Sequence, residues 1–314
     1  MDNECKYLIV DDVGGCFDHP WYKYKCALGH TILTPSISCA KCELNNKSKI
    51  YKSMEIHSKA AHELFPNNIV MLALQGSQNY GLETENSDVD TKLLITPSFD
   101  DIAYLRQPKS HTHVLPNNEH LDYKDVRLYF DAIKKQNPNF IEILFTDYYQ
   151  IGADYTDLIE ELISKREEIG RSNPLATIKA IKGSLLNKIH CYKNPSTDKK
   201  IESIAKYGYD PKEFGAIMRF EYFAVAFLSG LPYSECLHAK GKDLEDLKNY
   251  KAGALSMKEA DEMIEKIVGN TIKICEDYIE NHKNITIDPE IDNFLNKIQK
   301  EIVMRGLENE TIFY

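Results

Sequence analysis

Two short apolar runs on either side of one polar turn constrain the fold of this chain more than any other feature. The first run, IVMLAL at residues 69–74, is soon followed by Gly76 and Ser77. The second run, TKLLIT at residues 91–96, stops at Pro97. Short apolar runs bounded by glycine, proline and polar turn residues are typical of buried β-strands. We therefore expect two strands of an α/β domain, joined by the polar turn.

Two carboxylates, Asp88 and Asp90, stand at the start of the second predicted strand. Side chains of a strand alternate between its faces, so Asp88 and Asp90 should point one way and Val89 the other. Two carboxylates on one face repel each other unless a cation lies between them. Because hard oxygen ligands suit magnesium and manganese, the pair predicts a site for Mg²⁺ or Mn²⁺.

The Gly-Ser pair at the end of the first strand complements this predicted metal site. A glycine lets the backbone approach a triphosphate closely, and the hydroxyl of Ser77 can donate to a phosphate oxygen. Such a pair beside metal-bound carboxylates forms a site for in-line phosphoryl transfer. An isolated Ser-Asp-x-Asp is most often an ordinary turn, but its combination with Gly76 and Ser77 between two apolar strands favours the catalytic interpretation.

The stretch GSQNYGLETENSDVD, from Gly76 to Asp90, resembles the signature of the DNA polymerase β superfamily of nucleotidyltransferases. More narrowly, it is similar to predicted nucleotidyltransferases of bacteria and their viruses, some of which are encoded beside RNA ligases. The blocks NPNFIEILFTDYY (residues 137–149) and YGYDPKEFGAIMRF (residues 207–220) resemble two further segments of that family, in the same order. The resemblance spans roughly residues 70–230.

The resemblance implies a polymerase-β-like domain with a mixed sheet. It implies transfer of a nucleoside monophosphate from an NTP, such as ATP, to a hydroxyl acceptor, with release of pyrophosphate. The acceptor is left open between an RNA end, a protein and a small molecule. The alternatives are a catalytically silent protein that binds a nucleotide or a partner, as an antitoxin-like protein would, and a zinc-dependent nucleic-acid adaptor. The retained Asp-x-Asp pair argues against both, because a binding module needs no paired carboxylates.

The resemblance also implies a third carboxylate, which would help to hold the catalytic metal and activate the attacking hydroxyl. The corresponding region reads EHLDYKDV and contains Glu119, Asp122 and Asp125. We select Asp122, at the expected passage from strand to helix. Asp125 is better explained as an acidic residue at a helix N-terminus.

Lys212 and Arg219 lie seven residues apart in the third block. In a helix this spacing is about two turns, so both cations should share one face. The resemblance favours a role for that face in binding the triphosphate or a phosphorylated acceptor. In the alternative, Arg219 pairs with Glu213 or Glu221, or lies in solvent.

Five of the eight cysteines lie in the first 42 residues, outside the region of resemblance. A reducing compartment disfavours disulfides there, which leaves metal binding as the main alternative. Two short knuckles of thiolate and imidazole suit a structural Zn²⁺ site, with these expected ligands: Cys26, His30, Cys39 and Cys42. Cys16 and His19 are a rival pair that could replace the first knuckle.

Sequence patterns divide the chain into three regions and predict an α+β fold. Residues 1–50 form the zinc module, residues 51–150 the nucleotidyltransferase domain and residues 151–314 a helical domain that handles the substrate. Apolar periodicity of the helical kind dominates the last region.

Charge and hydropathy limit the partners of the chain. The formal net charge is −10, so a nucleic-acid partner must be held by a local basic patch. The sequence has no apolar run long enough to span a membrane and no secretory signal at its start. We therefore expect no membrane partner and place the protein in the cytoplasm, of the host if the chain is viral.

Overall fold

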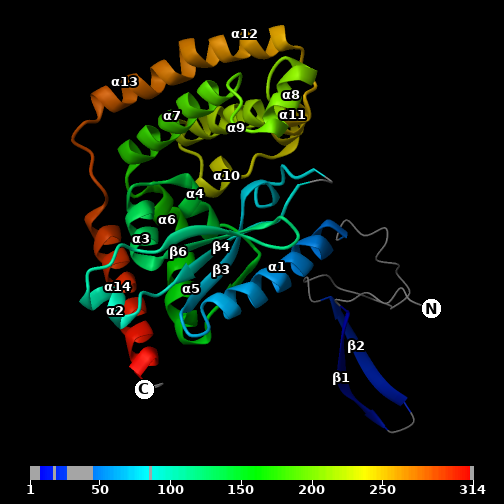
Figure 1. Cartoon of the computed structure of the whole chain (residues 1–314), viewed down its shortest axis with the longest axis vertical. Coiled ribbons are helices and arrows are strands. Elements are labelled where there is room, and N and C mark those ends of the chain that lie inside the picture. Colours follow the sequence, from blue (N-terminus) through cyan, green and yellow to red (C-terminus); the bar gives the residue numbers. More distant parts are fainter. Residues whose placement is uncertain (1–7, 17–18, 27–44, 85–86, 312–314) are drawn as a thin grey trace. The chain divides into compact units, whose positions relative to one another are not determined.

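The computed structural model describes residues 8–16, 19–26, 45–84 and 87–311 (Figure 1). The chain divides into two compact units, Met1–Ile56 and His57–Tyr314. None of the helices within the described ranges is both long enough and apolar enough to cross a membrane.

The first unit contains a two-stranded hairpin and the beginning of a long helix. Strand β1 (Leu8–Cys16) pairs antiparallel with β2 (His19–Cys26), and helix α1 (Asn45–Leu64) starts in this unit. The sequence analysis predicted a zinc module here without predicting the hairpin.

The predicted zinc site falls mostly outside the described residues. Cys26 ends strand β2, whereas three of its expected partners lie beyond the described ranges: His30, Cys39 and Cys42. The rival pair, Cys16 and His19, occupies opposed positions where the two strands meet at the hairpin turn. The zinc module therefore stays a prediction.

The second unit is built on a five-stranded mixed sheet. Its strands are β3 (Ile69–Gln75), β4 (Asp90–Ile95), β5 (Ser110–Val114), β6 (His120–Asp125) and β7 (Tyr149–Ile151). They lie in the order β5-β6-β4-β3-β7; β4 and β6 are parallel, and the other neighbours are antiparallel. The two apolar runs are β3 and β4, which are buried because they form the inner part of the sheet.

Helices surround and extend this sheet. Those nearest to it in sequence are α2 (Phe99–Ala103), α3 (Val126–Lys134), α4 (Pro138–Ile141), α5 (Thr156–Ser164) and α6 (Arg166–Arg171). The helical region continues with α7 (Pro174–Cys191), α8 (Asp198–Tyr207), α9 (Pro211–Leu228), α10 (Tyr233–Leu237), α11 (Gly241–Ala252), α12 (Met257–Ile267), α13 (Lys273–Asn281) and α14 (Pro289–Thr311). Figure 1 shows α7, α9 and α11 gathered at one end of the unit, whereas α14 lies toward the opposite end.

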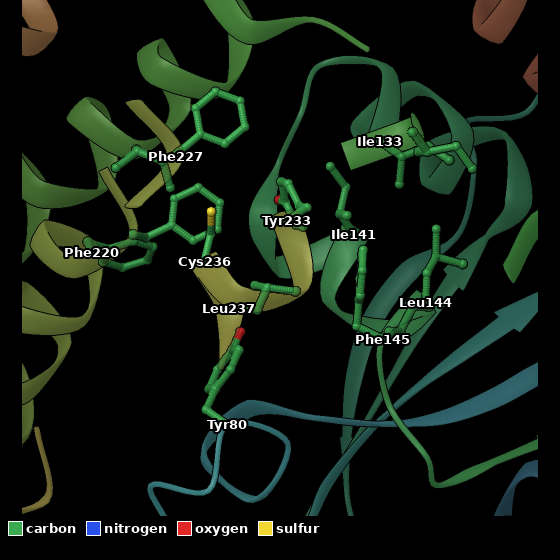
Figure 2. Close-up of a cluster of buried hydrophobic side chains, with 14 of the residues drawn as sticks. Tyr80, Ile133, Ile141, Leu144, Phe145, Phe220, Phe227, Tyr233, Cys236 and Leu237 are labelled. Atoms are coloured by element: carbon green, nitrogen blue, oxygen red, sulfur yellow. The ribbon is translucent and has the colours of Figure 1, made fainter. Parts of the chain in front are cut away.

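One hydrophobic core joins the sheet to these helices (Figure 2). Tyr233 of α10 stacks on Phe145 with 5.3 Å between ring centres, and it meets Phe227 of α9 edge-on at 6.3 Å. Because α10 contacts both parts, the core fixes α9 against the segment that precedes β7. Aromatic packing of this kind is largely apolar burial with a geometric preference, so it sets orientation as well as stability.

The structure confirms the predicted α+β class, the mixed sheet and the helical C-terminal region. The predicted boundaries at residues 50 and 150 stay predictions. The sheet and the helices after residue 150 belong to the same compact unit.

Candidate active site

The Gly-Ser turn follows β3 directly. Gly76 adopts a φ of +79°, a left-handed conformation that glycine tolerates far better than other residues. Its N–H donates to Oε2 of Glu142 at 3.2 Å, and Nδ2 of Asn79 donates to the backbone carbonyl of Glu142 at 3.2 Å. Burial raises the pKa of the Glu142 carboxyl. Because Glu142 belongs to the block NPNFIEILF, two of the blocks that carried the resemblance are hydrogen-bonded to each other here.

The Asp-x-Asp segment leads into β4. The strand begins at Asp90, so Asp88 precedes it and is exposed, while Val89 is fully buried. Val89 is thus buried between two more accessible carboxylates, while the common direction expected for Asp88 and Asp90 stays a prediction. Gln75 and Asp90 are register partners on β3 and β4, and strand pairing therefore brings the Gly-Ser turn beside Asp90.

Asp90 makes two contacts with the first residue of β6. Its Oδ1 accepts from the backbone N–H of His120 at 3.1 Å and lies 3.0 Å from Nδ1 of the same residue. Both side chains are about two-fifths exposed, at 37% for Asp90 and 43% for His120. The pair is therefore open to solvent and to a ligand. His120 was not among the site residues predicted from the sequence.

Asp122 lies further along β6, opposite Lys92 in the parallel register. Its Oδ2 is 3.0 Å from Nζ of Lys92, and its Oδ1 is 2.8 Å from Nζ of Lys124 and accepts from Oγ1 of Thr112 at 3.1 Å. Burial alone would raise the pKa of Asp122, but the two ammonium groups outweigh burial and lower it. Its role as a metal ligand stays a prediction, since its oxygens are held by two lysines.

The two other acidic residues of this region have different surroundings. Asp125 caps α3 by accepting from the backbone N–H of Arg127 at 2.8 Å, and it forms an ion pair with the same arginine. This confirms the reading of Asp125 as a helix N-terminal residue. Glu119 is buried beneath the Asp-x-Asp segment.

A cavity of about 470 Å³ opens beside Asp90 and extends to the helices. Its lining includes an acidic edge, formed by Gly76, Ser77 and Asp90. It also includes a cationic wall, which we define as Lys188 of α7, Lys212 and Arg219 of α9, and Lys251 of α11. The structure thus brings five of the residues selected from sequence to one cavity: Gly76, Ser77, Asp90, Lys212 and Arg219.

Lys212 and Arg219 share the cavity face of α9, as their spacing predicted. The Arg219 guanidinium lies 4.1 Å from the ring centre of Tyr80, whose buried side chain it covers. Neither cation forms an ion pair with another described residue. Of the rival partners, Glu213 pairs with Lys188 at 2.9 Å and also with Lys200.

Glu221, the other rival partner, accepts a hydrogen bond from Thr271 at 3.2 Å. Both rival carboxylates are thus engaged with other residues. Arg219 lines the cavity, and its charge also acts on the buried carboxyl of Glu142.

Lys251 reaches the cavity because α9 and α11 pack closely. A Cβ at Gly215 of α9 would lie 2.9 Å from Cβ of Lys251, so a larger residue would push the two helices apart. Burial lowers the pKa of Lys251, and the charges of Lys212 and Arg219 lower it further. Lys188 and Lys251 were missed from the sequence, since only the packing of three helices brings them together.

Asp88 and Asp90 are the candidate ligands for a metal ion. In the described part of the chain, no group of three or more His, Cys, Asp and Glu side chains is placed to hold a metal ion. Magnesium is usually bound by one or two carboxylates together with waters and substrate phosphates. Asp90 lines the cavity, and Asp88, two residues earlier in the chain, is exposed. This pair fits a Mg²⁺ or Mn²⁺ ion that binds together with a polyphosphate.

The chain matches no known protein family and no curated protein. Among solved structures, it is similar to a nucleotidyltransferase-like protein from Exiguobacterium sibiricum 255-15. The two share 10% identity at a TM-score of 0.29, over 69% of this chain and 76% of the other.

Proposed function

We propose that this protein is a metal-dependent nucleotidyltransferase, which transfers a nucleoside monophosphate from an NTP to a hydroxyl acceptor. One observation carries the proposal: a single cavity is lined by both the acidic edge and the cationic wall. Carboxylates favour a divalent cation, whereas ammonium and guanidinium groups favour phosphate. A cavity that offers both suits a triphosphate with its bound metal.

In the proposed reaction, the oxygen of the acceptor hydroxyl attacks the α-phosphorus of the NTP. The new bond forms as the bond from that phosphorus to the α,β-bridging oxygen breaks, so pyrophosphate leaves with this oxygen and the hydroxyl proton is released. A metal ion held by Asp88 and Asp90 would supply charge stabilisation to the reacting oxygens.

The residues around the cavity would bind and orient the triphosphate. Ser77 would donate to a phosphate oxygen at the acidic edge. Arg219, whose guanidinium packs on the ring of Tyr80, would bind a phosphate through two N–H groups. Lys212 and Lys251 would balance the charge that develops on the departing pyrophosphate.

A second candidate function is nucleotide binding without transfer. The observation that favours it is the engagement of Asp122 by Lys92 and Lys124, which occupies the expected third carboxylate. Such a protein would still bind an NTP at the cationic wall. It would leave the α–β bond of the nucleotide intact.

The decisive experiment uses the full chain with Mg²⁺ and each NTP, labelled in turn at the α- and at the γ-phosphate. Total RNA and a cell lysate serve as acceptors. Label that reaches a macromolecule from the α-position and not from the γ-position, with release of pyrophosphate, supports nucleotidyl transfer. Tight NTP binding without label transfer in any mixture supports the second candidate, and transfer of the γ-label instead contradicts both.

A further inference from the structure

A buried hydrogen-bond network lies on the face of β4 that points away from Asp90. His57 of α1 is fully buried, and its Nδ1 lies 2.6 Å from Oγ1 of Thr91. Its Nε2 lies 3.1 Å from Oε2 of Glu119, which is buried as well. The other oxygen of this carboxylate, Oε1, accepts from the backbone N–H of Val89 at 3.3 Å.

The turn between β5 and β6 holds Glu119 in place. The backbone N–H of Leu115 donates to the carbonyl of Glu119 at 2.9 Å, which closes the turn. The side chain of Asn117 donates to Oε2 of Glu119 at 2.7 Å and accepts from the backbone N–H of Glu119 at 3.2 Å. The carboxylate is therefore fixed by its own turn as well as by His57 and Val89.

The donors and acceptors of the network match one another. An ionised carboxylate only accepts hydrogen bonds, so Nε2 of His57 donates to Glu119 and Nδ1 accepts from the hydroxyl of Thr91. Burial lowers the pKa of His57 and outweighs the opposite effect of Glu119, which keeps the ring neutral at neutral pH. A neutral imidazole has one donor and one acceptor, as these two partners require.

We propose that Glu119 and His57 are positioning residues for Asp88 and Asp90. Val89 separates the two carboxylates in the chain, and Thr91 follows directly. Glu119 accepts from the N–H of Val89, and His57 accepts from the hydroxyl of Thr91. These two hydrogen bonds fix the backbone from which both carboxylates project. The inference deepens the proposed function and rests on it.

The groups that accept or donate these hydrogen bonds favour a positioning role for Glu119 and His57 over a purely structural one. Burying a carboxylate and an imidazole is unfavourable unless each is bonded, and apolar side chains would fill the same space at lower cost. Here both groups are directed at the segment that carries the acidic pair. In metal sites, residues that orient the ligands typically change metal affinity by about ten-fold to a hundred-fold when they are removed.

The test measures Mn²⁺ affinity by electron paramagnetic resonance, with a non-hydrolysable NTP analogue bound to the full chain. Glu119→Ala removes the bonds to Val89 and His57, and we expect a loss of Mn²⁺ affinity of about ten-fold or more. Glu119→Gln can still accept from Val89, and its amide N–H can donate to Nε2 of His57 once the neutral imidazole takes its other tautomer, so it should stay within roughly three-fold of the wild type. Rescue by this conservative variant separates geometry from charge.

Asp101→Asn is the matched control. Asp101 is a buried carboxylate that caps α2 and pairs with Lys109 at 2.8 Å, and it does not line the cavity. The variant should lower the melting temperature without changing Mn²⁺ affinity. If it weakens Mn²⁺ binding as much as Glu119→Ala does, the role of Glu119 is structural and the inference is overturned.

His57→Phe keeps the inference testable if Glu119→Ala does not fold. It fills the space of the ring but removes both of its hydrogen bonds, so we expect a smaller loss of Mn²⁺ affinity in the same direction. Wild-type affinity in every folded variant of Glu119 and His57 overturns the inference while leaving the proposed function intact. A wild-type chain that binds no Mn²⁺ with the nucleotide overturns the proposed function, and the inference with it.

Discussion

The acidic edge and the cationic wall of the cavity are built by different kinds of contact. At the acidic edge, the pairing of Gln75 with Asp90 places the Gly-Ser turn beside the carboxylates, so one turn of the chain determines the geometry. The cationic wall comes from three helices, α7, α9 and α11, which are packed together by the hydrophobic core and by the close approach of α9 and α11 at Gly215. The acidic edge could be predicted from the sequence because it depends on local strand pairing. The cationic wall could not be predicted in full because it depends on long-range packing.

The cationic wall differs in charge from the chain as a whole. The protein carries a formal net charge of −10, yet the cationic wall places four basic side chains around one cavity. A polyanion is therefore attracted to the cavity and repelled by much of the remaining surface. This fits a compact triphosphate better than a long nucleic acid bound along the surface.

The largest effect should come from the acidic edge. Asp90→Asn removes a charge that we propose binds the metal ion, and we expect the rate of nucleotide transfer to fall by at least about a hundred-fold. Asp88→Asn should act in the same direction. The transfer of α-labelled nucleotide gives the rate, and circular dichroism checks the fold. Asp100→Asn, at an exposed carboxylate outside the cavity, serves as the control, and full activity in the Asp88/Asp90 double variant would rule out the assignment.

The cationic wall should contribute less for each residue. Lys212→Met and Arg219→Met each remove one proposed phosphate contact, and we expect the NTP KM to rise or kcat to fall about ten-fold, or ~1.4 kcal/mol. Steady-state kinetics measures both parameters. Lys179→Met, at an exposed position of α7 outside the cavity, is the matched control. Unchanged kinetics in both variants would leave α9 as a scaffold.

Much of the acidic edge could be predicted from the sequence because its residues are close in the chain. Strand alternation distinguished Val89, which is buried, from the more accessible Asp88 and Asp90. The partners of Asp122 could not be predicted, because Lys92 meets it only through the parallel register of β4 and β6. Helical spacing predicted that Lys212 and Arg219 share a face.

Other parts of the site had no local signal. Lys251 belongs to a polar helix in which nothing distinguishes it from Lys248. His57 and Glu119 are buried and bonded to each other, although their sequence surroundings are those of an ordinary amphipathic helix and a turn. The zinc module stays a prediction, because most of its expected ligands lie outside the described residues.

A change at Gly215 tests whether helix packing sets the cationic wall. Gly215→Ala places a Cβ 2.9 Å from Cβ of Lys251, and overpacking of this kind destabilises a protein by about 1–3 kcal/mol. Displacement of α11 should also weaken NTP binding a few-fold. Urea unfolding and calorimetric titration measure the two effects. The control is Gly183→Ala on α7, where an added Cβ meets nothing within 4 Å, so the helix should gain about 0.5–1 kcal/mol.

The smallest expected effect is a pH dependence of NTP binding that depends on Lys251. Burial and the neighbouring charges of Lys212 and Arg219 lower the pKa of Lys251 in the free protein. A bound triphosphate would raise this pKa again, because it favours the charged ammonium. Binding should therefore take up protons in the alkaline range between the two pKa values, and affinity should fall as pH rises through it. One proton limits the fall to about ten-fold per pH unit, and we expect roughly three-fold.

Calorimetric titration in buffers of different ionisation enthalpy measures this proton uptake directly. Lys251→Met should abolish the uptake and flatten the dependence of affinity on pH. Lys248→Met, which removes an exposed lysine of the same helix that does not line the cavity, should leave both unchanged. If Lys251→Met keeps the wild-type slope, the proton is bound elsewhere and Lys251 does not contact the triphosphate. The cationic wall would then consist of the α9 pair and Lys188, and the close packing at Gly215 would serve the fold rather than the cavity.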